Sequence, residues 1–153
     1  MNRVMRYLLI ASTAASLFLM SSAPGRSLVD PVNRNGQGVA LKGYDPVAYF
    51  EQGRPVQGSP QFSHRWMEAT WWFATAEHRD LFTKDPQKYA PQFGGYCAYA
   101  LSEGYTANID PEAWKIVDGK LYLNYSRGVQ KKWEEDLQRR IQAAEKNWPA
   151  LHK

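Results

Sequence analysis

The chain has 153 residues, with 19 basic residues, 15 acidic residues and one cysteine. This length suits a single domain that buries a hydrophobic core without cross-links. A lone cysteine excludes an intramolecular disulfide framework and any zinc site built from several thiolates. The formal net charge of +4 is too small to indicate a nucleic-acid-binding protein.

The first 23 residues have the layout of a secretory signal peptide. Arg3 and Arg6 precede an apolar run, Leu8–Met20, and small residues follow up to Ala23. The run has 13 residues, which is short for a membrane-spanning helix. We therefore expect residues 1–23 to direct export to the periplasm of a Gram-negative bacterium and to leave no stable membrane span after cleavage. An uncleaved N-terminal anchor is the alternative.

The net charge and the composition of the chain both change after residue 23. Without Arg3 and Arg6 the net charge falls to +2, so the expected partners do not include nucleic acid. Residues 24–38 are rich in Pro, Gly, Asn and Ser, which predicts a flexible leader. Residues 39–149 show no internal repeat and are expected to form one domain.

Two β-hairpins are predicted in this domain. Residues 61–66 alternate in polarity, and residues 70–74 form an apolar, aromatic run, so these two segments predict the first hairpin. The second is predicted within residues 115–125, where Asp118 and Gly119 stand between apolar stretches.

Helices are predicted around the hairpins. Capping residues, an Asp-Pro start or apolar residues spaced three and four apart mark their positions. The predicted segments are a short helix beginning at Pro46 after the cap Asp45, residues 76–84 after the cap Thr75, residues 85–90, a turn over residues 110–114, and residues 126–148. Residues 96–101 fit a short helix or an extended segment. We expect a small α+β domain with two β-hairpins, several short helices and a long C-terminal amphipathic helix.

The order of motifs over residues 44–89 resembles the YHS domain. Asp45-Pro46-Val47 opens that pattern, Trp72-Phe73 ends its aromatic strand, and Asp85-Pro86-Gln87-Lys88-Tyr89 closes it. The continuation from Gly94 to Trp148 resembles the exported, stand-alone YHS proteins of bacteria. The resemblance implies a YHS-like domain over residues 39–149, with a C-terminal extension after the core motif.

The resemblance also implies a metal site whose usual ligands are mostly missing. The metals implied are transition ions such as copper, zinc or iron, which the family's cysteines are thought to bind. The corresponding positions here are Ala48, Ala74 and, approximately, His78. Soft-metal sites need several thiolate or imidazole donors within about 2.0–2.3 Å of the ion. His78 and Cys97 remain as candidate metal ligands, with His64 as a distant third.

Cys97 and His78 each allow a second interpretation. Cys97 follows Gly94 and Gly95 in an apolar run, so it is a reactive or metal-binding thiolate or a buried structural thiol, with an intermolecular disulfide as a third option. His78 lies near the start of a predicted helix, where the helix dipole disfavours an imidazolium ion. A neutral ring there suits metal ligation, base catalysis or simple packing.

The aromatic side chains exceed what a small core requires. Trp72, Tyr96 and Tyr99 are the candidate ligand-binding residues, for a sugar, a planar ligand or a haem, and core packing is the alternative. Trp71 and Trp72 point to opposite faces of a strand, so at least one should be partly exposed or covered by another element. The sequence shows no catalytic triad order, phosphate-binding loop or metalloprotease motif.

Three functions follow from these residues. The first is a periplasmic, non-catalytic YHS-like protein that binds a metal or a small ligand. The second is a structural module that binds a periplasmic protein. The third is a thiol enzyme or redox protein that uses Cys97 with His78 as its base.

Overall fold

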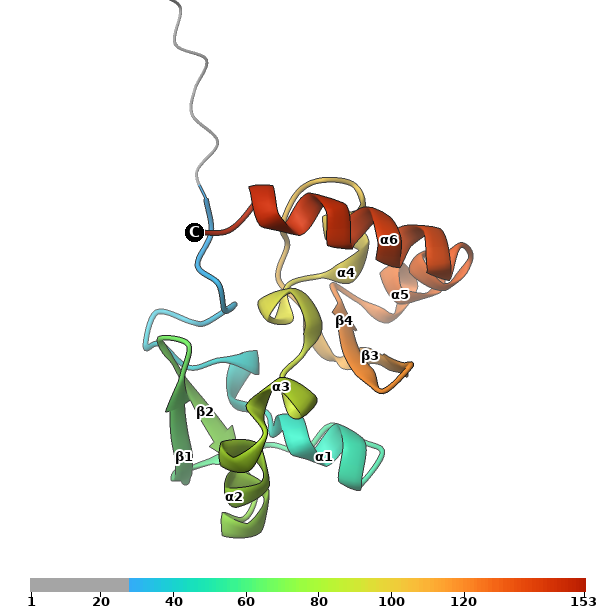
Figure 1. The fold of residues 1–153 in the computed structure, drawn as a ribbon. Coiled ribbons are helices and arrows are strands. Elements are labelled where there is room, and N and C mark those ends of the chain that lie inside the picture. The colour runs from blue at the N-terminus through green and yellow to red at the C-terminus, as the bar shows by residue number, and fades with distance from the viewer. Residues whose placement is uncertain (1–27) are drawn as a thin grey trace, which may run out of the picture.

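A computed structural model describes residues 28–153 and shows a small single α+β domain, as predicted (Figure 1). The predicted signal peptide lies outside the described residues. The regular helices and strands are α1 (Pro46–Glu51), β1 (Ser59–Trp66), β2 (Ala69–Phe73), α2 (Ala76–Lys84), α3 (Pro86–Tyr89), α4 (Ala98–Ser102), β3 (Asp110–Val117), β4 (Lys120–Asn124), α5 (Arg127–Glu134) and α6 (Leu137–Asn147). Three short 3-10 turns, η1 (Leu41–Gly43), η2 (Gln92–Gly95) and η3 (Trp148–Ala150), complete the described chain.

Side-chain caps begin several of these helices where the sequence predicts them. The Asp45 carboxylate accepts hydrogen bonds from the backbone N–H groups of α1, and Pro46 occupies the first helical position. Thr75 accepts from the N–H of His78 at the start of α2, and Ser126 accepts from that of Val129 at the start of α5. Each cap satisfies a donor that the first turn of a helix cannot pair internally.

Both predicted hairpins are confirmed. β1 pairs with β2, and β3 pairs with β4, in two separate antiparallel sheets. The second turn has positive φ angles at Asp118 (51°) and Gly119 (73°), the backbone that matches the twist of paired strands.

The predicted helical turn over residues 110–114 is wrong. Asp110 begins β3 and pairs with Asn124, and the Pro111 carbonyl accepts a hydrogen bond from the Tyr49 hydroxyl at 2.9 Å. The Asp-Pro pair is a local helix signal, and contacts with residues far along the chain override it here.

The predicted single C-terminal helix is divided into two. α5 ends at Glu134 and α6 begins at Leu137, because Asp136 takes a non-helical backbone conformation (φ −143°, ψ 54°). The break lets α5 pack on the β3–β4 hairpin while α6 packs along α4. The apolar spacing continues through the break, so the pattern itself does not mark it.

Residues 28–38 pack on the domain and do not form the flexible leader that their composition predicts. Val29 exchanges backbone hydrogen bonds with Leu151 and Lys153, and this segment lies beside the C-terminal end in Figure 1. The N–H of Asn33 donates to the Gly94 carbonyl at 2.8 Å, and Val32 is 3% exposed. Long-range pairing therefore orders a segment that is rich in turn-forming residues.

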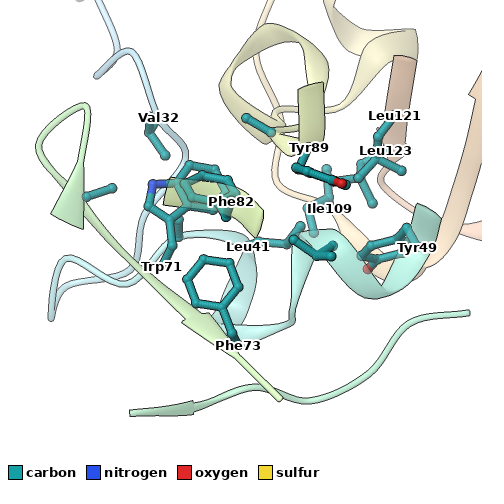
Figure 2. Close-up of a cluster of buried hydrophobic side chains, with 14 of the residues drawn as sticks. Val32, Leu41, Tyr49, Trp71, Phe73, Phe82, Tyr89, Ile109, Leu121 and Leu123 are labelled. Carbon is teal, nitrogen blue, oxygen red and sulfur yellow. The ribbon is translucent and has the colours of Figure 1, made fainter. Parts of the chain in front are cut away.

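The main hydrophobic core joins the two hairpins. Figure 2 shows aromatic side chains of β2 and α2 on one side of it and leucines of β4 on the other, with Leu41 and Ile109 between them. Trp71 and Phe73 pack against Phe82 with ring centroids 5.2 and 5.1 Å apart. A second cluster, centred on the fully buried Trp133, lies under α5 and α6.

Gly94 provides a test of how the N-terminal segment is held. Its φ is +61°, and a Cβ at this position would overlap the carbonyl oxygen of Pro31. We expect Gly94→Ala to lower the free energy of unfolding by at least about 2 kcal/mol, measured by urea denaturation. Gly36→Ala is the matched control, since a Cβ on Gly36 meets nothing within 4 Å, and it should change stability by less than about 0.5 kcal/mol. Equal effects of the two substitutions would contradict this account.

Candidate functional site

A buried carboxylate lies at the centre of the first half of the domain. Asp45 is 0% exposed, and its Oδ1 atom accepts hydrogen bonds from the N–H groups of Val47 (2.8 Å) and Ala48 (3.2 Å). Its Oδ2 atom accepts from the N–H of Ala74 at 2.9 Å and from Nδ1 of His78 at 2.6 Å. An ionised carboxylate only accepts hydrogen bonds, so the proton of this last bond belongs to His78 Nδ1.

The bond to Asp45 fixes the orientation of the His78 ring. Metal-binding and base histidines often donate Nδ1–H to a carboxylate in this way, which leaves Nε2 for the ligand or substrate. Soft-metal sites need further donors, however, and within residues 28–153 no three His, Cys, Asp or Glu side chains come close enough to hold an ion together. The described residues therefore contain no cluster of three such donors.

Cys97 lies directly before α4 and is 1% exposed. Its Sγ accepts a hydrogen bond from the N–H of Tyr125 at 3.3 Å and lies 3.7 Å from Oδ1 of Asn124, to which the thiol donates. Burial raises the pKa of the Cys97 thiol, and backbone hydrogen bonds lower it by less. The thiol is therefore protonated at neutral pH, which favours its interpretation as a buried structural group.

Cys97 and His78 have different partners. His78 is hydrogen-bonded to Asp45, the residue before α1. Cys97 is hydrogen-bonded to Asn124 and Tyr125, at the end of β4. No hydrogen bond joins the two side chains in the described part of the chain. Their roles as metal ligands remain predictions.

Asn124 is a site residue that the sequence reading missed. It is 0% exposed, and its Oδ1 atom accepts from the N–H of Tyr99 at 3.1 Å as well as from the Cys97 thiol. Its Nδ2 atom is buried without a hydrogen-bond partner among residues 28–153. The only signal in the sequence is a polar residue at the end of the apolar run of β4. The contact between Asn124 and Cys97, which lies 27 residues earlier, could not be inferred from that signal.

A pocket of about 250 Å³ opens beside Cys97. It is lined by α4 and the residue before it, by the loop after α4, by the turn between β4 and α5 and by α5. The lining residues are Cys97, Tyr99, Ala100, Tyr105, Ala107, Tyr125 and Val129. Cys97 and Ala100 are its most buried members, each 1% exposed, while Tyr105 and Tyr125 are 49% and 60% exposed and form its outer rim. The guanidinium of Arg140 lies 4.2 Å from the centre of the Tyr99 ring and helps to hold it.

The other two candidate aromatic residues lie elsewhere. Trp72 is half-buried, and its ring and backbone contact the chain at Gly43 and Gly58, where an added Cβ would come within 2.8 and 2.6 Å of Trp72 atoms. Trp71, on the opposite face of β2, is 1% exposed, so the predicted opposition of these two side chains is confirmed.

Tyr96 packs against Trp148 at 5.8 Å between ring centroids. Among the described residues, the predicted site residues Cys97 and Tyr99 line the pocket beside α4 together.

Comparison of the chain with protein-family models, with curated proteins and with solved structures gives no match. The described residues contain no helix that is long and apolar enough to cross a membrane.

The Asp45 carboxylate can be tested against a second Asp-Pro cap in the same chain. Asp85 caps α3 through the N–H of Lys88, but it is exposed and lies outside the core. We expect Asp45→Ala to cost about 3–5 kcal/mol in urea denaturation, because buried N–H groups and His78 lose their acceptor. Asp85→Ala should cost about 0.5–2 kcal/mol, the usual value of an N-cap. Similar losses for both would show that Asp45 acts only as a cap.

The state of Cys97 can be tested by alkylation. At pH 7 we expect iodoacetamide to label the folded chain far more slowly than the chain in guanidinium chloride, because the thiol is buried and its raised pKa keeps it protonated. Labelling of the folded chain should accelerate only at alkaline pH. Rapid labelling at pH 6, followed by mass spectrometry, would instead favour the thiol-enzyme interpretation.

Proposed function

We propose that this chain is a periplasmic, YHS-like, non-catalytic protein that binds a small uncharged ligand in the pocket beside Cys97. The observation that carries the proposal is the pocket itself, which unites Cys97 and Tyr99 with the exposed Tyr105 and Tyr125. Export is supported by the layout of residues 1–23, and the YHS-like character by the motifs of residues 44–89.

The lining indicates which ligands suit this pocket. None of the described residues that line it carries a formal charge, and the Cys97 thiol is neutral because burial raises its pKa. A charged ligand would lose hydration without gaining a counter-charge there. Tyrosine rings and small aliphatic side chains instead favour an apolar or aromatic ligand.

The size of the pocket further restricts the class of ligand. A volume of about 250 Å³ lies below the roughly 300–1,000 Å³ of pockets for drug-sized molecules. The ligand class that we propose is therefore a small ring compound, with at most a few polar groups directed toward the hydroxyls of Tyr105 and Tyr125.

The arrangement of the chemical groups favours binding over catalysis. Cys97 is bonded to Asn124 and Tyr125, and the described residues place no imidazole within hydrogen-bonding distance of its sulfur. A thiol nucleophile needs an adjacent base or a lowered pKa, and the pKa of this thiol is raised.

The proposal predicts binding of p-cresol and indole, used as probes, to the full-length chain. We expect dissociation constants of about 0.1–10 mM in NMR titrations, with shifts concentrated on amides near Cys97, Tyr105 and Tyr125. Ala107→Phe should abolish these shifts, because the added ring fills the pocket. Ala150→Phe adds the same ring at an exposed position outside the pocket and should leave binding intact.

The same titration separates this function from the second candidate. Exposed aromatic residues such as Tyr105 and Tyr125 are also typical of protein interfaces. If neither probe shifts the pocket amides at about 10 mM, or if Ala107→Phe leaves the shifts unchanged, the small-ligand function is wrong. The exposed tyrosines would then favour the structural module that binds a periplasmic protein.

A further inference from the structure

A larger groove, of about 460 Å³, lies on a different part of the molecule. The turn of the β1–β2 hairpin, the segment from α3 to η2 and the C-terminal end of the chain contribute to it, and Figure 1 shows where these elements lie. It shares no lining residue with the pocket beside Cys97. Its size falls within the range of pockets that bind small molecules.

Fixed aromatic rings form part of the groove. Trp66, near the hairpin turn, packs edge-on against Phe82 with ring centroids 5.7 Å apart and an interplanar angle of 86°. At the C-terminal end, Trp148 stacks on His152 at 4.1 Å with an interplanar angle of 17°. Because neighbouring rings already hold these side chains, a ligand would lose little free energy in ordering them.

Two glutamine amides and one histidine ring are polar groups of the groove that a ligand could use. Gln87 and Gln92 line it, and neither side-chain amide has a hydrogen-bond partner among residues 28–153. His152 donates Nδ1–H to the Trp148 carbonyl at 2.8 Å, so Nε2 is the ring nitrogen left for a ligand and is an acceptor in the neutral form of the ring. No Asp, Glu, Lys or Arg is among the described residues that line the groove.

This combination restricts the class of ligand. A purely apolar ligand would cover the amides of Gln87 and Gln92 without replacing their bonds to water, which costs free energy. A charged ligand would find no opposite charge. A neutral, hydroxyl-rich ligand with apolar faces avoids both losses. Its C–H faces pack on the aromatic rings, and its hydroxyls donate hydrogen bonds to the polar groups and accept hydrogen bonds from them.

We propose that this groove binds a neutral saccharide. Pyranose rings have an apolar face and a hydroxyl edge, which correspond to the aromatic rings of Trp66 and Trp148 and to the polar groups of Gln87, Gln92 and His152. This site is independent of the pocket beside Cys97, so the two proposals can fail separately.

The test is a titration of the full-length chain with cellotetraose, maltotetraose and fully N-acetylated chitotetraose by isothermal calorimetry. We expect at least one to bind saturably with a dissociation constant of about 5 mM or lower. Gln92→Met should weaken that binding about tenfold or more, because it removes the amide but keeps an unbranched side chain of similar length. Gln138→Met is the matched control on the exposed surface of α6 and should leave it unchanged.

A second variant tests the role of the C-terminal end. His152→Phe retains a ring to stack on Trp148 but removes the Nε2 acceptor, and it should also weaken saccharide binding. Thermal unfolding of each variant confirms that it is folded. Ala107→Phe, which fills the pocket beside Cys97, should leave saccharide binding unaffected.

Three results would overturn the proposal. The first is that none of the three saccharides binds at concentrations up to about 20 mM. The second is that binding persists unchanged in both Gln92→Met and His152→Phe. The third is that a blocked, uncharged proline-rich peptide binds in the groove while the saccharides do not.

Discussion

The first half of the domain depends on the hydrogen bonds to the buried carboxylate of Asp45. Burying a carboxylate is unfavourable unless hydrogen bonds replace its hydration, and four donors do so here. Two donors belong to α1, and the other two, at Ala74 and His78, come from the end of β2 and from α2. One side chain thus sets the position of the hairpin and α2 relative to α1. The aromatic packing of Phe73 and Phe82 follows from that placement.

Asn124 has a related role in the second half. Its side-chain carbonyl accepts from the first turn of α4 and from the Cys97 thiol, so the end of β4 and the start of α4 are held together by a buried polar contact. The pocket beside Cys97 lies along this junction, with the exposed Tyr125 directly after Asn124. The geometry of the proposed ligand site is therefore determined by a polar residue that does not itself line it.

Much of the fold could be predicted from local signals, and the failures have a common physical cause. The caps at Asp45, Thr75 and Ser126 and the Asp118–Gly119 turn act within a few residues, so the sequence reveals them. Asp110 carries a similar local signal, but its pairing with Asn124 overrides it. The candidate site depends almost wholly on long-range contacts. Cys97 and Tyr99 could be selected by residue type, whereas the Asp45–His78 bond and the groove with Gln87 and His152 could not.

The pairing of Val29 with the C-terminal end joins two segments that are far apart in the sequence. The Lys153 side chain also donates a hydrogen bond to Asp30, 123 residues earlier in the chain. The loop closed by these contacts therefore contains almost all of the described residues. Contacts of such separation carry a larger loop-closure entropy than those within a hairpin or a helix. Because Pro31 and His152 both line the larger groove, that groove is complete only while the segment around Pro31 and the C-terminal segment lie together. A ligand in this groove would therefore bind only while the two segments are paired, so its binding would stabilise that pairing.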